Sequence, residues 1–180
     1  MVEEKEFKNN YSANNNVDAL FLNGVLAIKI KKDRIHSKLN KIIRHEIAHV
    51  FISDSTGGKQ LPAWFEEGLS QYLEGGEHHN RIQDLKRMKT HEERIILKEI
   101  KTNLSLHRMP QIAYAQSLFL ARSIIRSYGF SKIRSFFDYV RKGVLFEDAF
   151  EKAFEVSLEK YEKKVNKQLN RWLNCSNCPL

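Results

Sequence analysis

Cysteine is scarce in this sequence and confined to one end of the chain. Only two cysteines occur among the 180 residues, Cys175 and Cys178 in "NCSNCPL". Cysteines this close together cannot cross-link distant parts of a fold, so nothing in the sequence requires an oxidising environment. The CxxC pair could form half of a zinc site or a redox pair, but neither a second cysteine pair nor a βαβ pattern accompanies it. We expect residues 174–180 to form a flexible tail.

Long apolar runs and targeting patterns are also missing. The most apolar segment, residues 17–30, contains polar residues and is shorter than the roughly 20 residues that a transmembrane helix needs. The first ten residues, "MVEEKEFKNN", lack the basic and then apolar pattern of a secretory signal. We therefore expect no membrane span. The compartment is left open, because a cytoplasmic chain and an exported chain that has lost its signal would look the same.

The composition is typical of one soluble globular domain. Hydrophobic residues make up 42% of the chain and charged residues 29%, and 180 residues suffice for one hydrophobic core. The net charge is +8, and a basic run lies between residues 29 and 44. Such a run could attract nucleic acid or acidic lipid. No nucleic-acid-binding motif accompanies it, so we interpret it as a solvated surface and expect no nucleic-acid partner.

Hydrophobic periodicity predicts a mainly α fold of the α+β class, in which a small N-terminal β element precedes about six helices. Residues 17–30 alternate around Asn23-Gly24, a dipeptide typical of a hairpin turn. Helical spacing begins near Asp33, and Pro and Gly residues separate the later helical segments. The predicted helices run from 33 to the "STGG" at 55–58, then over 62–74, 82–101, 111–128, 132–143, 146–154 and 158–173. We predict one domain over 17–173, preceded by a segment, 1–16, that is a candidate for disorder.

The stretch "RHEIAHV", residues 44–50, has the spacing of a metal site. Four residues along an α-helix is a rotation of about 400°, so His45 and His49 lie about 40° apart and one turn displaced. Both imidazoles can therefore reach one ion, and a catalytic zinc wants three protein ligands and one open position. Glu46 flanks the pair, where it can take a proton from water at the metal. The apolar residues of this helix centre about 150° away, so these are not core histidines.

A third ligand is available in "LPAWFEEGLSQYLEGG", residues 61–76. A second helix that crosses the first could bring a carboxylate to the histidines, and Glu66 and Glu67 are the candidates. Adjacent helical residues point about 100° apart, so only one of the two can coordinate. Glu74 lies two turns after Glu67 on nearly the same face. It could hydrogen-bond the free nitrogen of a ligand histidine, or it could be an exposed glutamate at a helix end.

Together, "HEIAHV" and "LPAWFEEGLSQYLEG" resemble the gluzincin metallopeptidases, and most closely the bacterial peptidase-MA-like domains. That family has HExxH, then a Pro-Trp segment, then a glutamate directly before Gly-Leu/Phe-Ala/Ser. The resemblance implies a zincin-like domain with one Zn²⁺ held by His45, His49 and Glu67, and with Glu46 as the catalytic glutamate. Tyr114 in "AYAQS" matches a tyrosine whose phenol often hydrogen-bonds the oxyanion in gluzincins. An aromatic side chain buried in the core is the alternative for Tyr114.

The function that this resemblance implies is zinc-dependent hydrolysis of peptide bonds in a peptide or protein substrate. The alternative is a non-catalytic zinc-containing module whose basic surface docks nucleic acid or an acidic partner. One departure concerns substrate binding, because the similar domains usually have a larger N-terminal sheet whose edge strand can hold a peptide. The remaining histidines that lack a partner at metal-binding spacing are expected at the surface, and phenylalanines near the C-terminal end in the core. These are His78, His79, His91 and His107, and Phe136, Phe137, Phe146, Phe150 and Phe154.

Overall fold

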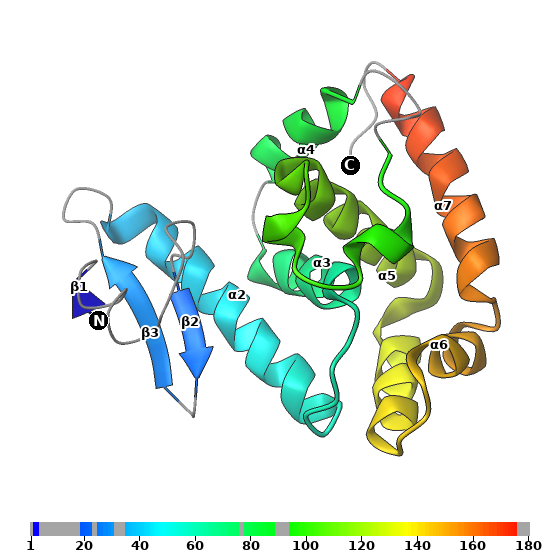
Figure 1. Ribbon diagram of the computed structural model, residues 1–180, viewed down its shortest axis with the longest axis horizontal. Coiled ribbons are helices and arrows are strands. Elements are labelled where there is room, and N and C mark those ends of the chain that lie inside the picture. Colours follow the sequence, from blue (N-terminus) through cyan, green and yellow to red (C-terminus); the bar gives the residue numbers. More distant parts are fainter. Residues whose placement is uncertain are drawn as a thin grey trace.

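Six helices dominate the fold within the residues that the computed structural model describes, which are 2–3, 19–22, 25–30, 35–75, 78–88 and 94–175. The long helix α2 lies between a small group of strands and a body formed by the other five helices (Figure 1). The fold is therefore mainly α. The helices are α2 (Ile35–Ser55), α3 (Ala63–Glu74), α4 (His79–Lys86), α5 (Pro110–Arg141), α6 (Phe146–Phe154) and α7 (Leu158–Leu173).

Three short strands precede α2. They are β1 (Val2–Glu3), β2 (Ala19–Leu22) and β3 (Val25–Ile30), and they pair in the order β1-β3-β2. β2 is antiparallel to β3 with Leu22 opposite Val25, and β1 is parallel to β3. The antiparallel pair occupies the segment for which the sequence predicts a hairpin. The turn residues 23–24 and the helix start predicted at residue 33 lie outside the described residues.

The reversal between α2 and α3 is built by the residues that the sequence marks as helix breakers. Gly57 and Gly58 adopt left-handed backbone angles, with φ of 65° and 74°, which glycine reaches without a steric penalty. The Thr56 hydroxyl donates to the carbonyl oxygens of Ser53 and Lys59, so the turn keeps its buried polar groups paired. The chain then enters α3 directly after Pro62, and α3 packs back against α2.

Aromatic side chains form most of the core around α3 and α5. Trp64 and Phe65 on α3 are completely buried, and the ring of Phe65 lies 4.8 Å from that of Phe136. The phenylalanines that were predicted to lie in the core do so: Phe136, Phe137, Phe150 and Phe154 are buried and Phe146 packs against them. A second cluster joins α4, α5 and α7 through Leu85, Met88, Ala115, Leu118, Leu169 and Trp172.

Helix boundaries near the C-terminus agree with the predicted signals. α5 is interrupted at Gly129, where φ is 74° and ψ is 171°, so the two helices predicted on either side of this glycine meet at a kink. α6 and α7 begin and end at the predicted residues. After α7, Cys175 is disulfide-bonded. The chain from residue 176 onward lies outside the described part. None of the described helices combines the length and apolar character that a membrane crossing requires.

The helix predicted over 82–101 is wrong in its extent. α4 begins earlier, at His79, and ends at Lys86, and only a 3₁₀ turn over Leu97–Ile100 comes after residues 94–96. The reason is tertiary, because the buried Ile95 exchanges both of its backbone hydrogen bonds with the side-chain amide of Gln116 on α5. These bonds replace the ones that a helix would have made. The sequence of this segment contains no signal for the hydrogen bonds between Ile95 and Gln116.

Gly68 sets the distance between α3 and α5. A Cβ atom at this position would lie 2.3 Å from the carbonyl oxygen of Ser117 and 3.0 Å from the Cβ of Ala121. The first distance is not possible for a real side chain without a shift of the α5 backbone, and the second is tighter than most real contacts. The two helices therefore touch through their backbones, and this contact fixes α3 at the residue directly after Glu67.

Gly68→Ala should lower the free energy of unfolding by about 1–3 kcal/mol, as overpacking of a core does. Helix propensity alone would give the opposite sign, a gain of up to about 1 kcal/mol. Urea denaturation of the metal-free protein measures the change. Ser70→Ala is the control on the same helix, because it adds no atom and removes a buried hydroxyl that has no hydrogen-bond partner. A Gly68→Ala variant as stable as the wild type would show that the close approach of α3 and α5 is not needed.

Candidate metal centre

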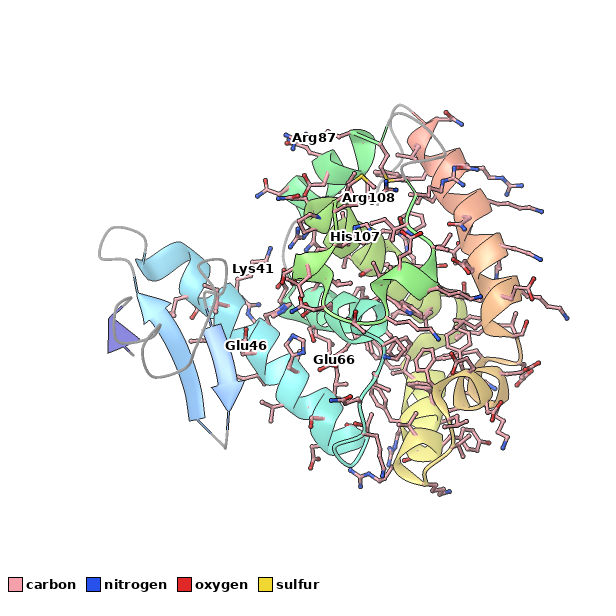
Figure 2. All side chains as sticks on the ribbon, viewed as in Figure 1. Lys41, Glu46, Glu66, Arg87, His107 and Arg108 are labelled. Carbon is pink, nitrogen blue, oxygen red and sulfur yellow. The ribbon has the colours of Figure 1, made fainter. Side chains whose placement is uncertain are left out.

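The structure brings together the three residues that were predicted to bind metal. One ligand atom from each of His45, His49 and Glu67 lies within 4.8 Å of the others. The two Nε2 atoms are 3.2 Å apart, and the Glu67 carboxylate lies 3.4 Å from His45 Nε2 and 3.8 Å from His49 Nε2. Both histidines come from α2 and the carboxylate comes from α3. Figure 2 shows these two helices side by side, with Glu46 and Glu66 labelled on them.

Each histidine ring is fixed by a carboxylate at its other nitrogen. Nδ1 of His45 lies 2.9 Å from Oε2 of Glu74, and Nδ1 of His49 lies 3.0 Å from Oε1 of Glu66. An ionised carboxylate can only accept, so both Nδ1 atoms carry the proton and donate it. The neutral form of each ring then has its lone pair on Nε2, on the side of the ring where Glu67 lies. This is the arrangement in which an imidazole binds a metal ion.

The adjacent glutamates on α3 therefore have different positions. Glu67 faces the two Nε2 atoms, whereas Glu66 contacts the outer nitrogen of His49. Glu66 was expected only as an alternative ligand, and its contact with the outer nitrogen was missed. The signal was present in helix geometry, since residues about 100° apart on α3 can reach the inner and outer sides of one ring. Glu74 contacts the outer nitrogen of the other histidine, which is one of the two alternatives that the sequence left open for it.

The donor set fits a divalent cation. Oε2 of Glu67 is buried and makes no hydrogen bond within the described residues, and its contact with His45 Nε2 at 3.4 Å is an ion pair when that ring is protonated. A cation in place of that proton would satisfy the same oxygen. Two imidazole nitrogens and one carboxylate oxygen are ligands that zinc prefers. The carboxylates near the pair, Glu46, Glu66, Glu67 and Glu74, also outnumber the two rings. The His45, His49 and Glu67 group could therefore hold a metal ion.

A proton on His45 balances part of the excess negative charge of these carboxylates when no cation is bound. Burial on its own would lower the pKa of His45, but the carboxylates of Glu67 and Glu74 outweigh it and raise the pKa to about 9. Burial raises the pKa of Glu46 and the Glu67 charge adds to this effect, although both histidines oppose it. A raised pKa makes Glu46 a stronger base than an exposed glutamate.

Tyr114 on α5 lies close to this group. The Gln71 side-chain amide donates to the backbone carbonyls of both Glu67 and Tyr114, at 3.2 and 3.0 Å, and so ties the two helices together at this level. Burial and the negative charge of Glu67 raise the pKa of Tyr114 to about 12, with Arg81 opposing. The phenol therefore stays protonated at neutral pH and can donate a hydrogen bond.

The expectation that His78 lies at the surface is wrong. It is buried at the start of α4, with Nδ1 3.6 Å from Oε1 of Glu74. Lys41 on α2 contacts the same oxygen at 3.1 Å, so this glutamate on α3 meets groups from α2 and from the start of α4. Although burial opposes it, His45 and Lys41 together lower the pKa of Glu74. Only 9% of the His107 side chain is exposed. Its Nδ1 accepts a hydrogen bond from the Met109 N–H at 3.0 Å. The side chains of residues 79 and 91 lie outside the described part.

Comparison with known proteins identifies one family. The model of a family described as "Peptidase MA superfamily" matches residues 13–171, which is most of the chain. No curated protein and no solved structure gives a significant match. The matched region contains all the residues of the metal centre.

In the metal-free protein the His45 ring should stay in its doubly protonated, charged form up to about pH 9, because its pKa is raised from the ordinary 6.5 to about 9. Because the folded pKa is the higher one, the proton stabilises the fold fully below about pH 6.5, and this contribution is lost as the pH rises through 9. An NMR titration of the His45 ring measures the pKa directly. Glu67→Gln should lower it, since one of the two carboxylates that hold the proton is then neutral. A pKa near 6.5 in the wild-type protein would contradict this charge arrangement.

Proposed function

Because the chain belongs to the peptidase MA superfamily, we propose that it is a zinc-dependent metallopeptidase of the gluzincin type that hydrolyses peptide bonds. Membership of this family implies a protein or peptide substrate. The observation that carries the proposal is the convergence of His45, His49 and Glu67 on one point, with Glu46 on the same helix as the histidines. We place the zincin-like catalytic domain at residues 17–173.

Three side chains would hold the ion, and two more would orient them. His45, His49 and Glu67 are the proposed ligands, and a zinc ion bound there supplies a Lewis acid that acidifies water and polarises a carbonyl group. Glu74 and Glu66 hold the outer nitrogens of the two rings, so both rings keep the tautomer and orientation that binding requires. No ligand has to rotate away from an alternative partner before the ion binds.

Glu46 is the proposed general base and acid. Its carboxylate accepts a proton from the water molecule whose oxygen attacks the carbonyl carbon of the peptide bond. It then delivers that proton to the nitrogen of the leaving amine as the carbon–nitrogen bond breaks. The products are a carboxylate and an ammonium group, which receives the second proton of the water molecule as well, and Glu46 returns to its starting state. The burial that raises the pKa of Glu46 favours both transfers, because it brings the pKa toward the working pH.

Tyr114 is the proposed stabiliser of the developing oxyanion. Its phenol stays protonated because its pKa is about 12, and it lies close enough to Glu67 to feel the charge of that carboxylate. A neutral phenol at this position can donate a hydrogen bond to the carbonyl oxygen as negative charge builds on it. The Gln71 bridge between the Glu67 and Tyr114 carbonyls would hold this donor at a fixed distance from the ligands.

Glu46→Gln should abolish most hydrolysis and leave metal binding intact, because the amide cannot accept the proton but does not disturb the ligands. We expect kcat to fall by about 10²- to 10⁴-fold. The measurement is cleavage of an unbiased peptide library followed by mass spectrometry, with kcat then determined on the best peptide. Glu151→Gln, an exposed glutamate on α6, is the matched control and should cleave normally. Normal cleavage by the Glu46→Gln variant would exclude this residue as the base.

Purified protein should carry about one zinc ion per chain by elemental analysis. The His45→Ala and Glu67→Gln variants should lose most of it, since each removes a ligand. Zinc at 100 times its Kd should stabilise the fold by about 2.7 kcal/mol, seen as a higher Tm, because the site does not exist in the unfolded chain. A wild-type protein that binds zinc and cleaves no member of the library would instead be a non-catalytic zinc module.

A further inference from the structure

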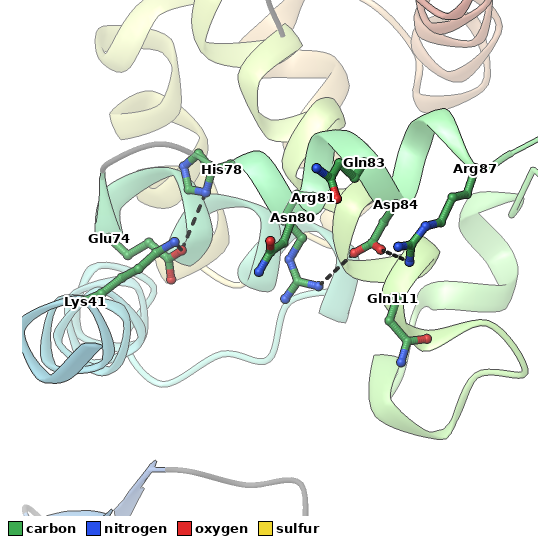
Figure 3. Close-up of a pocket in the computed structure, with 9 residues that line it drawn as sticks. All are labelled: Lys41, Glu74, His78, Asn80, Arg81, Gln83, Asp84, Arg87 and Gln111. Carbon is green, nitrogen blue, oxygen red and sulfur yellow. Dashed lines mark hydrogen bonds and ion pairs between the residues drawn. The ribbon is translucent and has the colours of Figure 1, made fainter. Parts of the chain in front are cut away.

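A polar pocket of about 490 Å³ adjoins the metal centre. It lies where α4 faces the start of α5 and the first half of α2, and Figure 3 shows the charged side chains that line it. Its volume falls within the range of small-ligand sites, about 300–1,000 Å³. The charged groups of its lining are Lys41, Glu74, Arg81, Asp84 and Arg87.

Two contacts connect this pocket to the metal centre. Glu74 lines the pocket with one carboxylate oxygen in contact with Lys41, and its other oxygen accepts the hydrogen bond from His45. On the other side, the guanidinium of Arg81 lies over the ring of Tyr114, 5.0 Å from its centroid. The side chain of Arg81 therefore separates the pocket from the proposed oxyanion donor, and the side chain of Glu74 separates it from a proposed metal ligand.

Both carboxylates that line the pocket contact cations, whereas the two guanidiniums have more N–H donors than these contacts use. Glu74 meets His45 at 2.9 Å and Lys41 at 3.1 Å. Asp84 is shared by two guanidiniums, at 3.4 Å from Arg87 and 3.9 Å from Arg81 (Figure 3). The Arg81 distance is too long for a hydrogen bond, and a guanidinium has five N–H donors. Within the part of the chain that the structure describes, three cations line the pocket against two carboxylates, which leaves a net positive charge and N–H donors that these contacts do not use.

The buried imidazole in the pocket responds to this positive potential. Burial lowers the pKa of His78, and the charges of Lys41, Arg81 and Arg122 lower it further, against the opposing effect of Glu74. At neutral pH His78 is therefore uncharged and does not neutralise either carboxylate. A ligand cation would be repelled by the same positive potential that disfavours protonation of His78, whereas an anion would be attracted.

We propose that this pocket binds a carboxylate group of the peptide substrate, with Arg81 as its main partner and Arg87 and Lys41 as supporting cations. The inference rests on the proposed peptidase function and specifies its substrate class. A carboxylate matches the fork of donors on a guanidinium, which can bind both of its oxygens at once. An apolar side chain would cover these charges without pairing them, and a basic one would meet the net positive charge.

The carboxylate can come from two parts of a substrate. An acidic side chain near the scissile bond would make the enzyme selective for Asp or Glu, and the C-terminal carboxylate would restrict cleavage to the end of a chain. Both present the same group to Arg81. The two sources predict different preferred peptides, so one experiment can separate them.

The first test compares matched peptides drawn from those that the wild-type protein cleaves. At each position near the cleaved bond, Glu is exchanged for Gln, and the free C-terminus is exchanged for an amide. One exchange should lower kcat/KM by about 10- to 100-fold, the value of a hydrogen bond to a charged group. Arg81→Gln should bring the ratio of kcat/KM for the acid and amide peptides close to one, chiefly through a higher KM for the acid peptide. Arg134→Gln on the exposed face of α5 is the matched control and should keep the wild-type ratio.

The second test measures binding without hydrolysis, so the pocket can be judged even if no peptide is cleaved. Blocked Ala-Glu-Ala and Ala-Gln-Ala, and Ala-Ala-Ala as the free acid and as the amide, are titrated into the protein while NMR follows the guanidinium signals of Arg81 and Arg87. One carboxylate probe should shift both signals, and its Kd from this titration should be at least tenfold lower than the Kd of its amide partner. Equal shifts with acid and amide, or none, would overturn the inference. If a carboxylate probe binds as expected but the protein cleaves no peptide, only the proposed function is overturned, and the pocket's preference for a carboxylate stands.

Discussion

Two carboxylate–imidazole hydrogen bonds, one for each histidine, orient the rings of the metal centre. Glu74 takes the outer nitrogen of His45 and Glu66 that of His49, so both inner nitrogens turn toward Glu67. Because the histidines lie on α2 and the three glutamates on α3, the site exists only while these helices stay in register. Gly68 and Gln71 fix α3 against α5, one through a backbone contact and the other through hydrogen bonds to both helices. The metal centre therefore depends on a packing contact made on the other face of α3.

The features of the fold and the site that could be predicted from sequence are those that local geometry decides. The spacing of His45 and His49 fixes their relation on one helix, and hydrophobic periodicity predicts two helices over residues 146–154 and 158–173, where α6 and α7 lie. The rest depends on contacts between distant segments. Gln116 supplies the backbone hydrogen bonds of Ile95 and so prevents a helix there. The burial of His78 results from the packing of α4 against its neighbours, which spacing cannot reveal.

Charge links the metal centre to the pocket beside it. Glu74 belongs to both, since one oxygen orients His45 and the other meets Lys41. Arg81 belongs to the pocket and lies over the ring of Tyr114. The groups proposed for catalysis and those proposed for recognition of a carboxylate are therefore neighbours in one electrostatic field. This arrangement would let an acidic substrate be held by α4 while its peptide bond lies over α2 and α3. The strands, by contrast, lie on the opposite side of α2 from the helical body (Figure 1).

X-ray absorption spectroscopy at the zinc edge is the most direct measure of the central claim, that one cation is shared by two imidazoles and one carboxylate. We predict a first shell of nitrogen and oxygen alone at about 2.0–2.2 Å, with the multiple-scattering signature of two histidines. Glu67→Gln protein, reloaded with excess zinc because it binds the ion weakly, should show a changed oxygen contribution and keep both rings. A shell that contains sulfur at about 2.3 Å, or a spectrum with fewer than two imidazoles, would contradict the claim.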